Sequence, residues 1–319
     1  MIEVKNLTKR YGNHLAVDHL NFTVESGKIY GFLGPNGAGK STTMNIMTGY
    51  LGATEGQVLI DGHDILKEPE EAKKNIGYLP EIPPLYMEMT VQEYLEFAAE
   101  LKGIKKDKRE PQIEEVIRLA KLRAVENRLI QNLSKGYKQR VGLAQAVLGF
   151  PEIIILDEPT VGLDPKQIIE IRELIRKLAK KHTVILSSHI LAEVREVCDY
   201  IMIISGGKLV ASDTTENLEN MMSGKGQIEV EAKASRDEMD HIIRRTGKIK
   251  EVKYRTSASG ITTAQIIAKG GEDIREELFL AFSHADVPML TLNQSKTILE
   301  EIFLELTQGS GNRMIKEEK

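Results

Sequence analysis

The sequence of residues 34–41 is Gly34-Pro35-Asn36-Gly37-Ala38-Gly39-Lys40-Ser41, and this stretch decides the fold. Its three glycines lack a Cβ atom, so the backbone there can approach another group closely. An apolar run at residues 28–33 predicts a buried strand before the stretch, and residues 41–47 predict a helix after it. This context is typical of a phosphate-binding loop, because backbone N–H groups and a helix N-terminus both attract anions. A plain glycine-rich turn is the alternative.

The loop also predicts how a nucleotide would be held. The Lys40 ammonium is placed to reach the β- and γ-phosphates, and the Ser41 hydroxyl is placed to bind Mg²⁺. We expect nine consecutive residues to contact the nucleotide: Gly34, Pro35, Asn36, Gly37, Ala38, Gly39, Lys40, Ser41 and Thr42.

Composition limits the other classes of function. The chain has 319 residues, of which 41% are hydrophobic and 28% charged, as in ordinary globular proteins. Its net charge of −4 gives no basic surface for nucleic acid, so no nucleic-acid partner is expected. The single cysteine, Cys198, fits a reducing compartment and an apolar core position. The sequence contains no apolar run of membrane-spanning length and no signal peptide, so we expect a cytoplasmic protein.

Acidic and histidine side chains follow two further predicted strands. Residues 153–156 are apolar and lead into Asp157 and Glu158. At the carboxyl end of a parallel strand, Asp157 is expected to hold Mg²⁺ through water, and Glu158 to polarise the attacking water. A helix N-cap is the alternative role for this pair. His189 follows the strand at 183–187 and is expected to contact the γ-phosphate, whereas His63 and His182 are expected at the surface.

The order of the predicted elements indicates an α/β protein with a P-loop core. Strands at 2–5, 20–24 and 57–61 predict a small antiparallel sheet beside the core. Charged helices occupy an insertion at about 82–145, after which strands and helices alternate again as in a parallel sheet. The first domain is predicted to span residues 1–222.

A second, smaller α+β domain is predicted at residues 223–307. Its strands at 227–232, 250–256, 262–269 and 289–293 and helices at 235–246 and 272–285 follow the β-α-β-β-α-β order of ferredoxin-like folds. A final helix at 296–306 and a disordered tail at 308–319 complete the prediction.

The segment Leu133-Ser-Lys-Gly-Tyr-Lys-Gln-Arg140 resembles the signature sequence of ATP-binding-cassette (ABC) ATPases, Leu-Ser-Gly-Gly-Gln. Leu133, Ser134 and Gly136 match this sequence, while Lys135 and Tyr137 depart from it. By its residues alone the segment is a helix start capped by Ser134. The resemblance implies that Ser134 and Gly136 bind the γ-phosphate of an ATP molecule held by a second subunit.

Other family elements follow in order over residues 1 to about 220. The resemblance implies that Tyr11 stacks on adenine, although an ordinary turn tyrosine is the alternative. It implies that Asp164, in Gly162-Leu-Asp-Pro, couples the two sites of a dimer. It makes His189 the switch histidine and Glu158 the catalytic carboxylate. Glu81 stands where the family has glutamine, so we expect it to bind the metal and to alter the metal dependence.

Pro80-Glu81 and the signature variant resemble the corresponding segments of cassettes that serve ABC-2 type exporters, of the gliding-motility and the sodium- or drug-efflux types. Residues 295–304 also resemble the C-terminal segment of that group. The resemblance implies an ATPase that pairs with a second copy or a paralogous cassette. It further implies an integral membrane permease as partner, which would hold the chain at the inner face of the membrane. Four apolar residues are candidates for this contact, unless they pack the insertion's own core: Ile82, Leu85, Tyr86 and Met87.

Two other hypotheses remain open at this point. The first is a soluble ABC ATPase that acts on a non-membrane partner such as DNA or ribosomes. The chain lacks the long coiled coil of chromosome-maintenance types and the second cassette of translation types, which argues against it. The second hypothesis is that the C-terminal domain is a dimerisation or sensor unit that regulates the ATPase.

Overall fold

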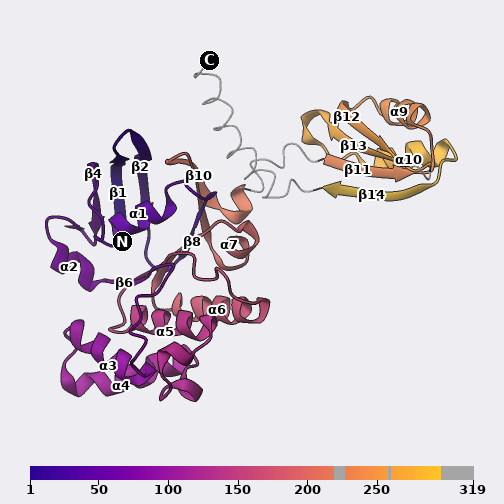
Figure 1. Ribbon diagram of the computed structural model, residues 1–319. Coiled ribbons are helices and arrows are strands. Elements are labelled where there is room, and N and C mark those ends of the chain that lie inside the picture. The colour runs from indigo at the N-terminus through magenta and orange to yellow at the C-terminus, as the bar shows by residue number, and fades with distance from the viewer. Residues whose placement is uncertain (219–226, 258–259, 296–319) are drawn as a thin grey trace. The chain divides into compact units, whose positions relative to one another are not determined.

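The computed structural model describes residues 1–218, 227–257 and 260–295. Contacts within the chain divide it into two compact units, and the chain passes from the first to the second between Thr214 and Thr215. The predicted boundary between residues 222 and 223 lies outside the described residues, as do the predicted helix at 296–306 and the predicted tail. Each unit is therefore described by itself (Figure 1).

The first unit begins with a four-stranded antiparallel sheet in the order β2-β1-β4-β5. Its inward side chains, such as Ile2, Val4 and Leu20, are almost fully buried and alternate with exposed ones. This alternation is the reason that the segment folds as half-buried strands. The strands are β1 (Ile2–Tyr11), β2 (His14–Val24), β4 (Glu55–Ile60) and β5 (His63–Asp64).

A six-stranded sheet in the order β10-β9-β3-β8-β7-β6 forms the centre of the unit. The five strands from β9 to β6 are parallel, and β10 pairs antiparallel with β9. β3, β7 and β8 are buried along their whole length, which accounts for the apolar residues that fill β7 and the middle of β8 and predominate in β3. The strands are β3 (Ile29–Leu33), β6 (Ile76–Leu79), β7 (Ile153–Leu156), β8 (Thr183–Ser188), β9 (Tyr200–Ser205) and β10 (Lys208–Thr214).

Helices connect the parallel strands, and three of them belong to the predicted insertion. α3 begins with a capping box in which Thr90 and Glu93 bond each other's backbone N–H groups, and its buried face packs on α4 and α5. In Figure 1, α3 and α4 lie at the end of the unit away from the antiparallel sheet. The helices are α1 (Lys40–Met47), α2 (Pro69–Lys74), α3 (Val91–Leu101), α4 (Lys106–Leu119), α5 (Lys135–Val147), α6 (Pro165–Leu178) and α7 (Leu191–Val197).

A glycine in β3 allows α7 to pack directly on the central sheet. A Cβ atom on Gly31 would lie 2.2 Å from Val194 Cγ1 and 2.9 Å from the Cys198 sulfur. Both distances are shorter than van der Waals contact, so no larger residue fits without displacing the helix. Gly31 therefore fixes the position of α7, and Cys198 is a buried core residue as predicted.

The second unit is a four-stranded antiparallel sheet in the order β12-β13-β11-β14, with two helices. Met239, Ile242 and Ile243 of α9 and Leu278 and Phe282 of α10 are buried in its core. The chain order β-α-β-β-α-β is the predicted one. The elements are β11 (Gln227–Ala232), α9 (Arg236–Arg244), β12 (Ile249–Thr256), β13 (Thr262–Ala268), α10 (Arg275–His284) and β14 (Met289–Ser295).

The close packing at Gly31 generates the first prediction. Replacing Gly31 with alanine should lower the free energy of unfolding by about 1–3 kcal/mol, because the new methyl group overpacks the contact with Val194. Urea unfolding followed by circular dichroism measures the change. Gly52→Ala is the matched control, since a Cβ atom there meets open space. A second substitution, Val194→Ala, should restore part of the loss. Equal losses of stability at Gly31 and Gly52 would contradict the conclusion that Gly31 is needed for α7 to pack on β3.

Candidate active site

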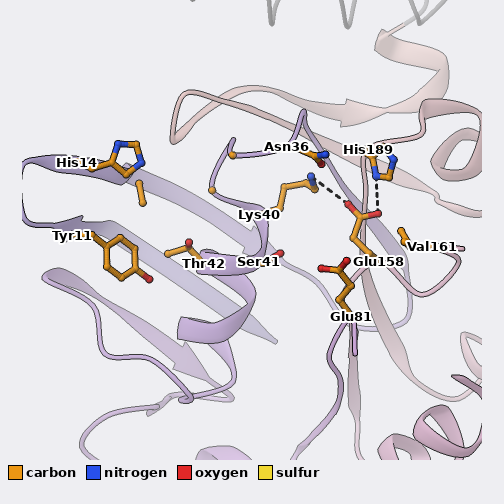
Figure 2. A pocket seen from close by; sticks show the side chains of 13 residues that line it. Tyr11, His14, Asn36, Lys40, Ser41, Thr42, Glu81, Glu158, Val161 and His189 are labelled. Carbon is orange, nitrogen blue, oxygen red and sulfur yellow. Dashed lines mark hydrogen bonds and ion pairs between the residues drawn. The ribbon is translucent and has the colours of Figure 1, made fainter. Parts of the chain in front are cut away.

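The carboxyl ends of four adjacent parallel strands bring the predicted site residues together. They are the ends of β3, β8, β7 and β6, which lead into the glycine-rich loop, His189, Asp157-Glu158 and Glu81, respectively. A cleft of about 520 Å³ lies along this edge (Figure 2). Ten predicted residues line it: Tyr11, Asn36, Gly37, Gly39, Lys40, Ser41, Thr42, Glu81, Glu158 and His189. Three lining residues were not predicted: His14, Ala16 and Val161.

The glycines of the loop make room for neighbouring backbone atoms or adopt a left-handed conformation. Gly39 is the N-cap of α1 with φ 102°, and a Cβ atom there would lie 2.5 Å from the Ala16 carbonyl oxygen. A Cβ atom on Gly34 would lie 2.5 Å from the Ile204 carbonyl oxygen. Gly37 has open space around it but a φ of 79°, which side chains disfavour. Two of the glycines thus admit neighbouring backbone, a reason that the sequence did not reveal.

The Lys40 side chain is buried and is held from three sides. Its ammonium donates to the carbonyl oxygens of Gly34, at 2.9 Å, and of Pro35, at 3.3 Å. It also lies 3.3 Å from Glu158 Oε1, and both side chains of this pair are less than a tenth exposed. The nearby Ala38 is buried and does not line the cleft. The loop therefore points one fixed positive charge into the cleft.

Glu158 stands between Lys40 and His189. Its second oxygen, Oε2, lies 3.0 Å from His189 Nδ1, and Figure 2 shows both contacts. The backbone of Glu158 is left-handed, with φ 46°, which is uncommon for a residue with a side chain. Its N–H group donates to the Ser187 hydroxyl at 2.8 Å, and this bond supports the conformation. A carboxylate, a histidine and an ammonium thus form one connected group.

Asp157 forms a second group with two hydroxyls. Its Oδ1 accepts from the Ser41 hydroxyl at 3.3 Å and from the Ser187 hydroxyl at 2.5 Å. Ser187 is completely buried and bonds to both acidic residues, yet it was not predicted as a site residue. The signal was present in the sequence, because Ser187 ends an apolar strand two residues before His189. A carboxylate and a hydroxyl oxygen at the mouth of the phosphate loop are hard ligands of the kind that suits Mg²⁺.

Tyr11 lies on the other side of the cleft from Glu158 (Figure 2). The tyrosine is 49% exposed, so its ring is free to stack with a planar group. Lys9 extends over the same ring, with its nitrogen 5.4 Å from the ring centre. The cleft therefore has an aromatic end and a charged end.

Seven predicted residues do not line this cleft. Gly34, Pro35, Ala38 and Asp157 lie within two residues of a lining residue along the chain, whereas Ser134, Gly136 and Asp164 come from other segments. Ser134 is the N-cap of α5, but its side chain makes no capping bond. Gly136 packs against Gln167, since a Cβ atom there would lie 2.4 Å from Gln167 Oε1. Asp164 caps α6 by accepting from the Gln167 N–H group at 2.9 Å. Gly136 and Asp164 both contact Gln167, where the start of α5 packs against the start of α6.

A larger cavity of about 850 Å³ adjoins the cleft and shares Ser41 and Glu81 with it. Burial and the nearby Asp157 charge raise the pKa of Tyr78 in this cavity, so its hydroxyl stays protonated and donates to Asn45 at 3.0 Å. Burial also lowers the pKa of Lys102 to about 8. The Lys102 nitrogen donates to the carbonyl oxygens of Gln145 and Leu148, at 2.8 and 2.6 Å, where it caps α5.

The expectation for His182 was wrong. The residue is 6% exposed, and its Nδ1 lies 2.6 Å from the Pro151 carbonyl oxygen. Phe150 stacks on its ring, with the ring centres 6.5 Å apart. His182 is therefore a buried residue, whereas His63 is partly exposed as expected.

Within the described residues, no helix is both long and apolar enough to cross a membrane. The same part of the chain contains no group of three or more His, Cys, Asp or Glu residues that could hold a metal ion by itself. A metal bound in the cleft would accordingly need ligands beyond these side chains, such as the Ser41 hydroxyl or phosphate oxygens.

Comparison with known proteins agrees with this geometry. The family described as ABC transporter matches residues 17–161. The bacitracin transport ATP-binding protein BcrA of Bacillus licheniformis is 42% identical over 69% of this chain and 71% of its own length. The linearmycin resistance ATP-binding protein LnrL of Bacillus subtilis is 31% identical over 96% of this chain and 98% of its own.

Solved structures give the same result. The dimeric cassette MJ0796 in a post-hydrolysis state with ADP and Pi matches with a TM-score of 0.62 and 28% identity, over 67% of this chain and 98% of that one. The identity and coverage of these relatives, together with the cleft at the strand ends, show that the chain belongs to the ABC transporter family, as one of its ATP-binding and ATP-hydrolysing proteins.

Proposed function

We propose that the chain powers an ABC exporter, and that two copies close around two ATP-Mg²⁺ to drive a separate membrane permease. The observation that supports this proposal is the group formed by Lys40, Glu158 and His189 beside the Ser41–Asp157 pair. The names of relatives add support for export, since they include bacitracin transport, linearmycin resistance and lantibiotic transport proteins. The transported substrate is a property of the permease.

The residues near Ser41 suit a magnesium ion. The Ser41 hydroxyl and the Asp157 carboxylate lie 3.3 Å apart, and the carboxylate of Glu81 lines the same cleft. Mg²⁺ in such sites neutralises charge that develops on the phosphates. We infer that Ser41 and Asp157 hold it, Asp157 through water, and that Glu81 is a further oxygen ligand. Ser187 orients Asp157 for this role through its 2.5 Å hydrogen bond.

The remaining residues would promote attack of water on the γ-phosphate. The polyphosphate competes with Glu158 for the Lys40 ammonium, since both are anions, and its binding would free one oxygen of Glu158. That carboxylate can then accept a proton from the attacking water. His189, which bonds the other oxygen, would hold Glu158 in place and contact the γ-phosphate. Catalysis in this scheme rests on positioning and charge neutralisation.

A second copy of the chain would complete the site. Ser134 and Gly136 are outside their own cleft, and the exposed Ser134 hydroxyl makes no capping bond. We infer that this helix start binds the γ-phosphate in the partner subunit, and that Asp164 lies between the two sites. A paralogous cassette could take the place of the second copy. The dimeric form of the related cassette supports this arrangement.

The larger cavity is the proposed contact for the permease. Tyr50 and Ile82 on its rim are 83% and 82% exposed, which is unusual for large apolar side chains. Tyr86 and Met87 nearby are also exposed, whereas Leu85 is half-buried. Because Glu81 lines both this cavity and the nucleotide cleft, a permease segment here would sit beside the catalytic group. The contact would hold the chain at the cytoplasmic face of the membrane.

The catalytic role of Glu158 can be tested by Glu158→Gln. Hydrolysis should fall by roughly 100-fold or more, because the amide cannot accept the proton of the attacking water. The variant should still bind ATP and accumulate as a dimer, which light scattering on a sizing column measures. Glu152→Gln, at the opposite end of β7, is the matched control and should retain hydrolysis. An ATP-bound variant that stayed monomeric would count against shared sites.

The role of Glu81 can be tested by its replacement with the family's usual glutamine. We expect hydrolysis to continue, while the Mg²⁺ concentration that gives half the maximal rate rises on the order of tenfold. The reason is that an amide is a weaker ligand than a carboxylate, and the relative rate with Mn²⁺ should change as well. Glu88→Gln, an exposed acid of the same segment, should leave both metal profiles as they are. Unchanged profiles in Glu81→Gln would exclude it as a metal ligand.

The proposed contact between the larger cavity and the permease can be tested by Ile82→Asp. The added charge should weaken capture of a membrane protein encoded next to this chain by about tenfold, since an apolar contact at an interface centre is lost. Co-purification from detergent measures the effect. Leu101→Asp changes another exposed leucine-sized side chain, 71% exposed and outside the cavity, and should not weaken capture. An equal loss in both variants would point to a different docking surface.

A further inference from the structure

A buried carboxylate lies behind the catalytic group and takes no part in the chemistry described above. Glu193, in the first turn of α7, is 6% exposed. Its Oε2 accepts from the Thr160 hydroxyl at 2.6 Å and from the Ser188 hydroxyl at 3.2 Å. Among residues 1–218, 227–257 and 260–295, it makes no ion pair with a cation. A buried charge without a counter-ion is costly, so hydrogen bonds must compensate for it.

The two hydroxyls come from two different segments of the site. Thr160 lies two residues after Glu158, at the start of the loop that runs through Val161 to Asp164. Ser188 ends β8 and directly precedes His189, and its carbonyl oxygen accepts from the Gly34 N–H group at 3.4 Å. Thr160, Ser188 and Glu193 are all buried. One carboxylate oxygen therefore joins the loop at 159–164 to the strand end that carries the histidine and borders the phosphate loop.

The surroundings of Glu193 are rigid. Glu193 belongs to α7, which packs directly on Gly31 of β3, where no larger side chain fits. The Ser188 hydroxyl also accepts from the Ile190 N–H group at 3.0 Å, which fixes its direction. A displacement of Thr160 would thus act on Ser188 through two hydrogen bonds to the same buried carboxylate oxygen.

From these contacts we propose that Glu193 is a positioning residue that transmits movement of the 159–164 loop to the Glu158–His189 pair. The inference rests on the proposed function, in which Asp164 of this loop lies between the two shared ATP sites. Closure of one site moves the loop, and the Thr160–Glu193–Ser188 bonds carry this movement to His189. Cooperativity between the sites is thereby assigned to a residue that does not line the nucleotide cleft.

The test uses the full chain and the ATP dependence of hydrolysis. Wild type should show a Hill coefficient above 1, because two sites close together. Thr160→Val keeps the shape but removes the hydroxyl, and it should bring the Hill coefficient toward 1 and lower kcat by about fivefold. Glu193→Gln should act in the same direction. Binding of a fluorescent ATP analogue should be unchanged in both variants, since neither residue lines the cleft.

Two control variants separate positioning from stability. Thr160→Ser restores the hydroxyl and should recover the cooperativity of wild type. Glu196→Gln alters another carboxylate of α7, one that pairs with Arg172 at the surface and should affect only the melting temperature. If Thr160→Val and Glu193→Gln melted earlier but kept the wild-type Hill coefficient, Glu193 would be merely structural and the inference would be wrong.

A different result marks failure of the proposed function. Wild type would then hydrolyse ATP with a Hill coefficient of 1, and Glu158→Gln would stay monomeric with ATP. Shared sites would be excluded in that case, and the coupling role of Glu193 would be excluded with them.

Discussion

The buried charge pair of Lys40 and Glu158 constrains everything around it. Their charged atoms lie 3.3 Å apart, and each side chain is less than a tenth exposed. Charges in such an environment must be paired and hydrogen-bonded, and here the Gly34 and Pro35 carbonyls and His189 complete the set. An anionic phosphate is one of the few groups that can take the place of Glu158 beside Lys40. The pair therefore defines both the ligand and the residue that the ligand would release for chemistry.

The sequence was sufficient to predict those parts of the fold that depend on local chemistry. Apolar runs at β3, β7 and β8 lead into polar residues, and parallel strands align such ends at one edge of a sheet. This rule predicted that Lys40, Glu158 and His189 lie close together, and they line the same cleft. The alternation of predicted strands and helices in the second unit likewise predicted its chain order.

The unpredicted features depend on contacts between distant segments. Ser187 and Glu193 look like ordinary polar residues in sequence, and only tertiary packing buries them against Asp157 and Thr160. His182 was expected at the surface because it does not follow a predicted strand as His189 does, yet it contacts Phe150 and the Pro151 carbonyl oxygen. The glycines of the loop were predicted to let the backbone approach a phosphate. Gly34 and Gly39 also make room for the backbones of Ile204 and Ala16. A pattern in one segment carries no information about such partners.

The strand order has an evolutionary consequence. β8 lies between β3 and β7, so Lys40 and Glu158 belong to segments that follow strands two positions apart. Their charged atoms nevertheless lie 3.3 Å apart, so the length of these side chains matters as much as their charge. Aspartate differs from glutamate by a single nucleotide and carries the same charge, but it is one methylene shorter. A mutation from glutamate to aspartate at position 158 would therefore keep the charge but withdraw it from Lys40, so the placement of the two segments restricts which acid can serve there.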